Sequence, residues 1–97
     1  MLVSFKPQRI QTSANTTITP AHIVGARLVS TTSADVIVHL HDTTGATSAS
    51  TRIATLLTTN FGADEIGYPL RVISGTCIVS PVVSAGGTTA TVYLFVR

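Results

Sequence analysis

His39 and His41 are the clearest candidates for a chemical role such as metal binding, because a single residue separates them. Successive side chains of a β-strand point to opposite faces, so both imidazoles would share one face of a strand. Some zinc sites use this spacing, and Asp42 or His22 could supply a further ligand. No third ligand follows at a spacing that fixes the geometry. We therefore expect two histidines on a solvent or interface face and no metal.

The remaining polar constellations do not predict catalysis. Asp64 and Glu65 are adjacent carboxylates in a loop, where such pairs are usually solvated and bind no Ca²⁺. A Ser–His–Asp set could be assembled from His39, Asp35 and one of many serines, but the chain has no Gly-x-Ser-x-Gly turn. The Gly86–Gly87 pair lacks the lysine and helix of a phosphate loop. We expect a non-enzymatic protein with no catalytic residues and no cofactor.

The cysteine and the loop aromatics also have simple interpretations. Cys77 is the only cysteine, which excludes an intrachain disulfide, and its apolar neighbours predict a small buried side chain. Phe61, Tyr68 and Pro69 flank a long loop and could form a sugar-stacking patch. Aromatic residues in this position more often pin a loop to the core. A small carbohydrate-binding module stays open as an alternative.

The composition describes a single small domain with a neutral surface. The chain has 97 residues, of which 10% are charged and 44% hydrophobic, and its net charge is +2. A charged share of about a quarter is usual, so Ser and Thr supply most of the polarity here. Such a domain has a small core and a surface suited to burial against a partner. We expect a homo-oligomer, most simply a trimer.

Several partner classes are not expected. The six Lys and Arg residues are scattered, and aromatic residues make up only 5% of the chain, so nucleic acid is not an expected partner. No apolar run approaches the roughly 20 residues of a membrane helix, so no membrane is expected. Residues 1–7 contain no apolar stretch of the kind found in signal peptides, which predicts synthesis in a cytoplasm.

Alternating apolar and polar residues predict strands over most of the chain. A strand pair is predicted at His22–Ser30 and Asp35–Asp42, joined by Thr31–Ala34. One face of the second strand carries Val36, Val38 and Leu40, and the other carries Ile37, His39 and His41. Thr51–Leu57 is a third strand, and Thr58–Pro69 is the longest predicted loop. Further strands are predicted at Leu70–Ser74 and Thr76–Val83, where Gly75 marks a turn or bulge and Pro81 an edge position or a bulge.

The two ends of the chain have different patterns. Ser84–Thr88 contains Gly-Gly and predicts a final hairpin, whose last strand from Ala90 is apolar on both faces and is therefore central or covered. Pro7–Pro20 is polar and rich in Thr, which fits either an extended arm or an edge strand with a loop. We divide the chain into an N-terminal strand and arm at 1–21 and a domain at 22–97. The fold class is an all-β antiparallel sandwich or jelly-roll-like barrel.

The chain resembles capsid decoration (cement) proteins and head accessory proteins of tailed bacteriophages. The resemblance covers most of the chain from His22 onward and lies in its sequence style, since no signature motif is present. The segments that carry it are Gly25–Val29, Asp35–Asp42, Pro69–Val72, Ser74–Thr76 and Ala90–Leu94.

This resemblance implies a β-sandwich module, often trimeric, that binds neighbouring major capsid proteins on the capsid surface of the virion. It implies no catalytic residues. A head–tail or tail accessory protein is the alternative within this class. The residues expected to contact a partner are Gln8, Ile10, Thr12, Asn15, Thr17 and Ile18 in the arm, and Tyr93 and Phe95 in the last strand.

Overall fold

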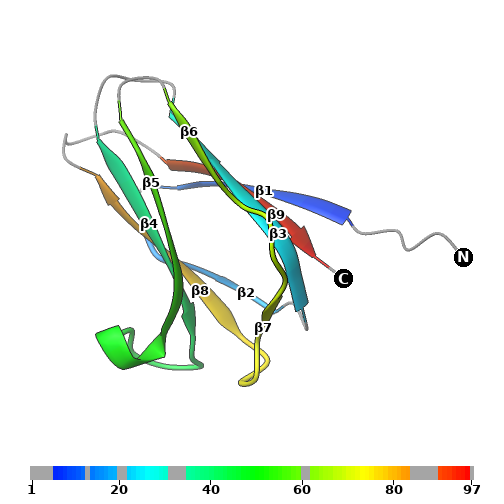
Figure 1. The fold of residues 1–97 in the computed structure, drawn as a ribbon. Helices are drawn as coiled ribbons and strands as arrows, with labels where there is room; N and C mark the ends of the chain where they lie inside the picture. The colour runs from blue at the N-terminus through cyan, green and yellow to red at the C-terminus, as the bar shows by residue number, and fades with distance from the viewer. Residues whose placement is uncertain are drawn as a thin grey trace, which may run out of the picture.

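Two antiparallel sheets face each other in a sandwich (Figure 1). The computed structural model describes residues 6–12, 14–19, 22–30, 35–59, 62–83 and 90–96. These residues contain strands, turns and one short 3₁₀ turn, η1 (Ala49–Thr51), and no α-helix. No helix among them is long and apolar enough to span a membrane. The predicted all-β sandwich is confirmed.

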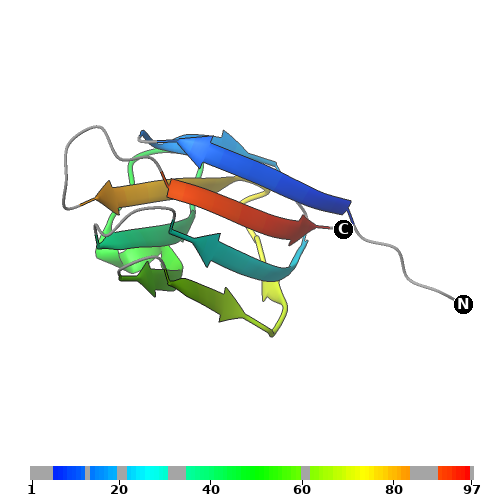
Figure 2. The same cartoon turned by 90° about the horizontal axis from the view of Figure 1, so that it is seen from above.

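Each sheet combines strands from both ends of the chain. Sheet A has the order β1 (Lys6–Thr12), β9 (Ala90–Val96), β3 (His22–Val29) and β6 (Ala63–Ile66), and the short β7 (Leu70–Arg71) also pairs with the start of β3. Sheet B has the order β2 (Thr16–Ile18), β8 (Cys77–Val83), β4 (Val36–Asp42) and β5 (Arg52–Thr58). Figure 2 shows β1, β9 and β3 lying side by side.

The strand pairing has jelly-roll topology. β4 pairs with β5, β3 with β6, β2 with β8 and β1 with β9, so the pairs are nested as in one long hairpin that has been rolled up. Rolling this hairpin gives the two four-stranded sheets of a double Greek key. The jelly-roll form of the predicted fold is therefore the one that the structure shows.

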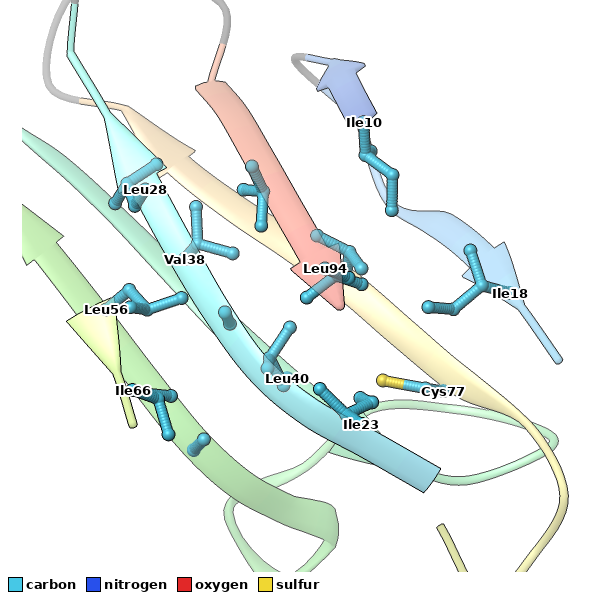
Figure 3. Packing of buried hydrophobic residues seen from close by; sticks show 14 of the residues in the cluster. Ile10, Ile18, Ile23, Leu28, Val38, Leu40, Leu56, Ile66, Cys77 and Leu94 are labelled. Atoms are coloured by element: carbon cyan, nitrogen blue, oxygen red, sulfur yellow. The ribbon is translucent and has the colours of Figure 1, made fainter. Parts of the chain in front are cut away.

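The core lies between the sheets and follows the alternation of each strand. β4 contributes Val36, Val38 and Leu40, which are almost completely buried, as the alternation predicted. The other core residues come from the remaining strands except the short β7, and one, Val72, follows β7. They are Ile10, Ile18, Ile23, Ala26, Leu28, Ala54, Leu56, Ile66, Val72, Cys77, Val79, Val92 and Leu94. Figure 3 shows how residues of this cluster pack together. The buried position predicted for Cys77 is confirmed.

The structure shows edge strands where an extended arm was considered. β1 pairs with β9 from Lys6↔Val96 to Thr12↔Ala90, and β2 pairs with β8 from Thr16↔Val79 to Ile18↔Cys77. Each of these strands places one isoleucine in the core, Ile10 and Ile18, both 6% exposed. A segment with one buried side chain in a polar sequence is typical of an edge strand whose outer side faces water.

Three strand predictions need correction. The predicted strand pair at His22–Asp42 does not form, because β3 and β4 lie in opposite sheets. β8 and β9 also lie in opposite sheets, so they form no hairpin; their connection at 84–89 lies outside the described residues. The long loop predicted at Thr58–Pro69 contains β6, which pairs with β3.

Other strand predictions are confirmed. β9 is apolar on both faces and lies between β1 and β3, as expected for a central strand. Gly75 has φ +82° in the turn before β8, a conformation that favours glycine. Pro81 lies beyond the point where β2 stops pairing with β8, so on that side β8 is locally an edge in the described part of the chain.

Candidate functional site: the outer faces of the two sheets

The outer face of sheet B carries an exposed apolar row. Ile37 on β4 lies opposite Leu57 on β5 and Val82 on β8, and these three side chains form the apolar row. Leu57 and Val82 are 50% and 51% exposed. Large exposed hydrophobic side chains that are adjacent in space are typical of a surface that contacts another molecule.

The two histidines lie on the same face, next to this row. Their ring centroids are 6.0 Å apart, with an edge-to-face angle of 79°. His39 Nδ1 lies 2.9 Å from the Thr55 hydroxyl on the neighbouring strand. The partial burial of His39 lowers its imidazole pKa, and the nearby Arg52 and His41 lower it further. The neutral imidazole is therefore favoured in the folded protein.

His41 holds the η1 turn against sheet B. It is 3% exposed, and its Nδ1 lies 2.9 Å from the Thr51 hydroxyl. That hydroxyl donates its one hydrogen to the Ser48 carbonyl at 3.0 Å, which assigns Nδ1–H of His41 as the donor in the imidazole contact. Burial and then Arg52 lower the pKa of His41. Among the described residues, no three His, Cys, Asp or Glu side chains form a group that could hold a metal.

Three of the carboxylates have structural partners. Asp42 accepts the backbone N–H groups of Ile73 and Ser74 at 2.9 Å each and also the Ser74 hydroxyl, which fixes the turn before β8. The Ser74 hydroxyl, followed by the two N–H groups, lowers the pKa of Asp42. Asp64 accepts the backbone N–H of Leu57 at 3.0 Å and so joins the edges of the two sheets.

Glu65 forms an exposed ion pair with Arg27, at 2.8 Å. The prediction that Asp64 and Glu65 are solvated carboxylates in a loop is therefore correct only in part. Both residues belong to strand β6, and Asp64 accepts a hydrogen bond from the main chain.

The outer face of sheet A carries a row in which arginines alternate with an aromatic ring. Tyr93 on β9 lies opposite Arg9 on β1 and opposite Arg27 on β3, and we name these three residues the arginine–tyrosine row. Glu65 on β6 extends the row through its ion pair with Arg27. Phe95 projects from the same face of β9, two residues after Tyr93.

An apolar hollow lies beside Phe95 on this face. It has a volume of about 260 Å³ and is lined by Val24, Gly25, Ile66, Gly67 and Phe95. A β-bulge between Ile23 and Gly25 interrupts the pairing with β9, so Val24 is the extra residue in β3. A Cβ atom on Gly25 would lie 3.0 Å from the Ile66 carbonyl oxygen, so a larger residue there would require β6 to shift by a few tenths of an ångström.

Comparison with protein-family models, curated proteins and solved structures gives no match. The assignment of function therefore rests on the surfaces described above.

The structure places the partner-contact residues expected from the sequence in different parts of the sandwich. Ile10 and Ile18 are core residues, so they cannot be contact residues in the folded protein. Gln8, Asn15 and Thr17 are exposed near one lateral edge of the sandwich. Thr12 is in β1, but its side chain is outside the described set.

Tyr93 and Phe95 lie on the outer face of sheet A, away from the core. Arg9, Arg27 and Gly25 were not predicted as contact residues, because only strand pairing brings them to Tyr93 and Phe95 from distant positions in the sequence. The Phe61 position in the sugar-patch hypothesis lies outside the described residues, and Tyr68 is 59% exposed.

Proposed function

We propose that this protein is a non-enzymatic virion structural protein, a decoration (cement) protein that binds the major capsid protein lattice of a tailed bacteriophage from the outside. The observation that carries the proposal is the character of the two outer sheet faces. No second layer covers either face in the described part of the chain (Figure 1). Both faces carry exposed apolar or aromatic groups among few charges, and protein contact surfaces have this composition.

The topology supports the same class of function. Double-sheet jelly rolls recur in viral capsid and lectin domains. A fold alone does not assign an activity, so the jelly-roll topology supports a virion role only together with the composition of the outer faces. It is consistent with the resemblance to phage head proteins seen in the sequence.

The proposed mechanism is stabilisation by mass action. A protein that binds the assembled lattice, and not its free subunits, stabilises the lattice by an amount that grows with its concentration. A homotrimer would multiply weak single contacts through effective concentration. A cyclic trimer uses two different surfaces of each subunit, and the apolar row on the outer face of sheet B is a candidate for one of them.

The test is co-sedimentation of the purified protein with expanded capsids that lack their own decoration protein. We expect saturable binding, with no binding to free major capsid protein, and light scattering of the free protein at trimer mass. Capsids carrying the protein should resist heat better than bare capsids. Absence of binding to expanded capsids would refute the proposal, and ring symmetry other than three would favour a head–tail accessory protein.

A small carbohydrate-binding module is the second candidate. It is favoured by the aromatic and polar side chains that share the outer face of sheet A: Tyr93, Phe95, Arg9, Arg27 and Glu65. Saturable binding of a soluble oligosaccharide in titration calorimetry, lost on Tyr93→Ala, would support this candidate over capsid binding.

A further inference from the structure

The apolar hollow and the arginine–tyrosine row form one continuous surface on sheet A. Strand β9 connects them, because Phe95 lines the hollow and Tyr93 lies two residues before it on the same face. Gly25 is opposite Phe95 and Arg27 is opposite Tyr93, so β3 continues both parts. A ligand that occupies the hollow would therefore also meet the row.

The size and lining of the hollow favour one inserted side chain over a small-molecule ligand. Small-molecule sites usually have volumes of about 300–1,000 Å³ and contain a few convergent polar groups. This hollow has a volume of about 260 Å³, and its five lining residues are apolar or glycine. A single aliphatic or aromatic side chain needs no polar partner, so it suits this lining.

The composition of the surrounding surface is that of a protein interface. Tyrosine and arginine are the residues that most often dominate binding energy at such interfaces, and they cluster around well-packed pockets. The described charged side chains of this face are Arg9, Arg27, Arg71 and Glu65, which leave an excess of two positive charges. Charge complementarity therefore calls for acidic residues on the partner.

We infer that the outer face of sheet A binds a protein partner that inserts one leucine-sized apolar side chain, flanked by carboxylates, into the apolar hollow. The inference deepens the proposed function, since the partner would then be a segment of the major capsid protein. A second copy of this chain is a poorer occupant through Ile73, the most exposed large hydrophobic residue in the described part of the chain. Ile73 is 81% exposed, but Arg71 lies two residues before it and would bring a further positive charge to Arg9 and Arg27.

The first experiment is a nuclear magnetic resonance titration of the ¹⁵N-labelled protein with blocked tripeptides. Glu-Leu-Glu should shift the amide signals of Gly25, Gly67 and Phe95. Glu-Ala-Glu should bind at least about tenfold more weakly, because it lacks the apolar anchor. Lys-Leu-Lys should bind about twofold to fivefold more weakly, since exposed charge pairs contribute modestly. Equal binding of all three peptides, or shifts confined to another face, would overturn the inference.

A matched pair of glycine variants tests the hollow without disturbing the fold. A Cβ atom at Gly67 or at Gly45 meets no atom within 4 Å, and neither residue has a positive φ. Gly67→Val adds a side chain to the lining of the hollow and should weaken Glu-Leu-Glu binding about tenfold. Gly45→Val changes an exposed loop outside the hollow and should leave binding unchanged. Equal affinities of the two variants would refute insertion into the hollow.

The same variants separate this inference from the proposed function. If the wild-type protein and both variants bind expanded capsids equally, the hollow is not the contact and the inference fails, while capsid binding stands. If Glu-Leu-Glu binds the hollow but the wild-type protein does not bind capsids, the proposed function fails and the surface assignment stands. Tighter binding of cellohexaose or decathymidylate than of Glu-Leu-Glu at this face would refute a protein partner.

Discussion

Replacement of the buried isoleucines of the edge strands tests whether residues 8–19 belong to the sandwich. Ile10 and Ile18 are each 6% exposed, whereas Ile73 is 81% exposed. The change to alanine removes about three methyl or methylene groups, worth roughly 0.8 kcal/mol each when buried, or about 2.4 kcal/mol in all. The cavity left behind adds to this loss, and we expect Ile10→Ala and Ile18→Ala each to lower the free energy of unfolding by about 2–4 kcal/mol.

The measurement is urea unfolding followed by far-ultraviolet circular dichroism, with thermal unfolding as a second readout. For a domain of this size, the expected loss corresponds to a fall in Tm of about 10–25 °C. Ile73→Ala is the matched control, since the same atoms are removed from an exposed turn, and it should change stability by no more than about 0.5 kcal/mol. If Ile10→Ala behaves like Ile73→Ala, the edge strands do not pack on the core and residues 8–19 act as a detachable arm.

Three further predictions concern polar groups. Asp42→Asn should lower stability by about 1–3 kcal/mol, because the amide cannot accept all the hydrogen bonds that the carboxylate accepts, whereas Glu65→Gln at the exposed ion pair should cost less than about 1 kcal/mol; urea unfolding at pH 7 measures both. His39 and His41 have lowered pKa values in the folded state, so the unfolded chain binds more protons below about pH 6.5 and stability should fall as the pH falls below that value. Replacement of both histidines by asparagine should remove that part of the pH profile of Tm, and an unchanged profile would contradict this origin. Thr58 has a buried hydroxyl with no hydrogen-bond partner among the described residues, so Thr58→Val should keep or raise stability, by up to about 1 kcal/mol in thermal unfolding.

Side-chain alternation in the sequence predicted which faces of the strands are buried, but not how the strands pair. The pattern of Val36, Val38 and Leu40 predicted the buried face of β4, and the two apolar faces of β9 predicted its central position. Alternation says nothing about which sheet a strand joins, because a short connection can either turn back within a sheet or cross to the other. The predicted pairings of β3 with β4 and of β8 with β9 were therefore wrong, although the strands themselves were present.

Strand β6 was missed because its own residues do not favour a strand. Asp64 and Glu65 have low β-propensity, and the flanking glycines predicted a loop. The strand forms because β3 supplies a pairing edge and the Asp64 carboxylate accepts the Leu57 N–H from the other sheet. Tertiary contacts of this kind outweigh a local preference of a few tenths of a kcal/mol, and no local pattern reveals them.

Only part of the candidate binding surface on sheet A could be predicted from the sequence, for a related reason. Tyr93 and Phe95 could be found, because they share a face within one strand. Their neighbours Arg9, Arg27 and Gly25 come from strands far away in the chain, and only the register of β1 and β3 against β9 brings them together. In a jelly roll the first and last strands of the chain are partners, so its sheet faces are assembled from the most distant parts of the sequence.

Three of the four carboxylates of this chain have partners within the molecule. Asp42 and Asp64 accept main-chain N–H groups, and Glu65 forms an ion pair with Arg27. Carboxylates bound in this way organise turns and sheet edges while they keep their charge. A net charge far from zero keeps proteins soluble and monomeric, and with 10% charged residues and a net charge of +2 this chain has little of it, which fits the proposed function within an assembly.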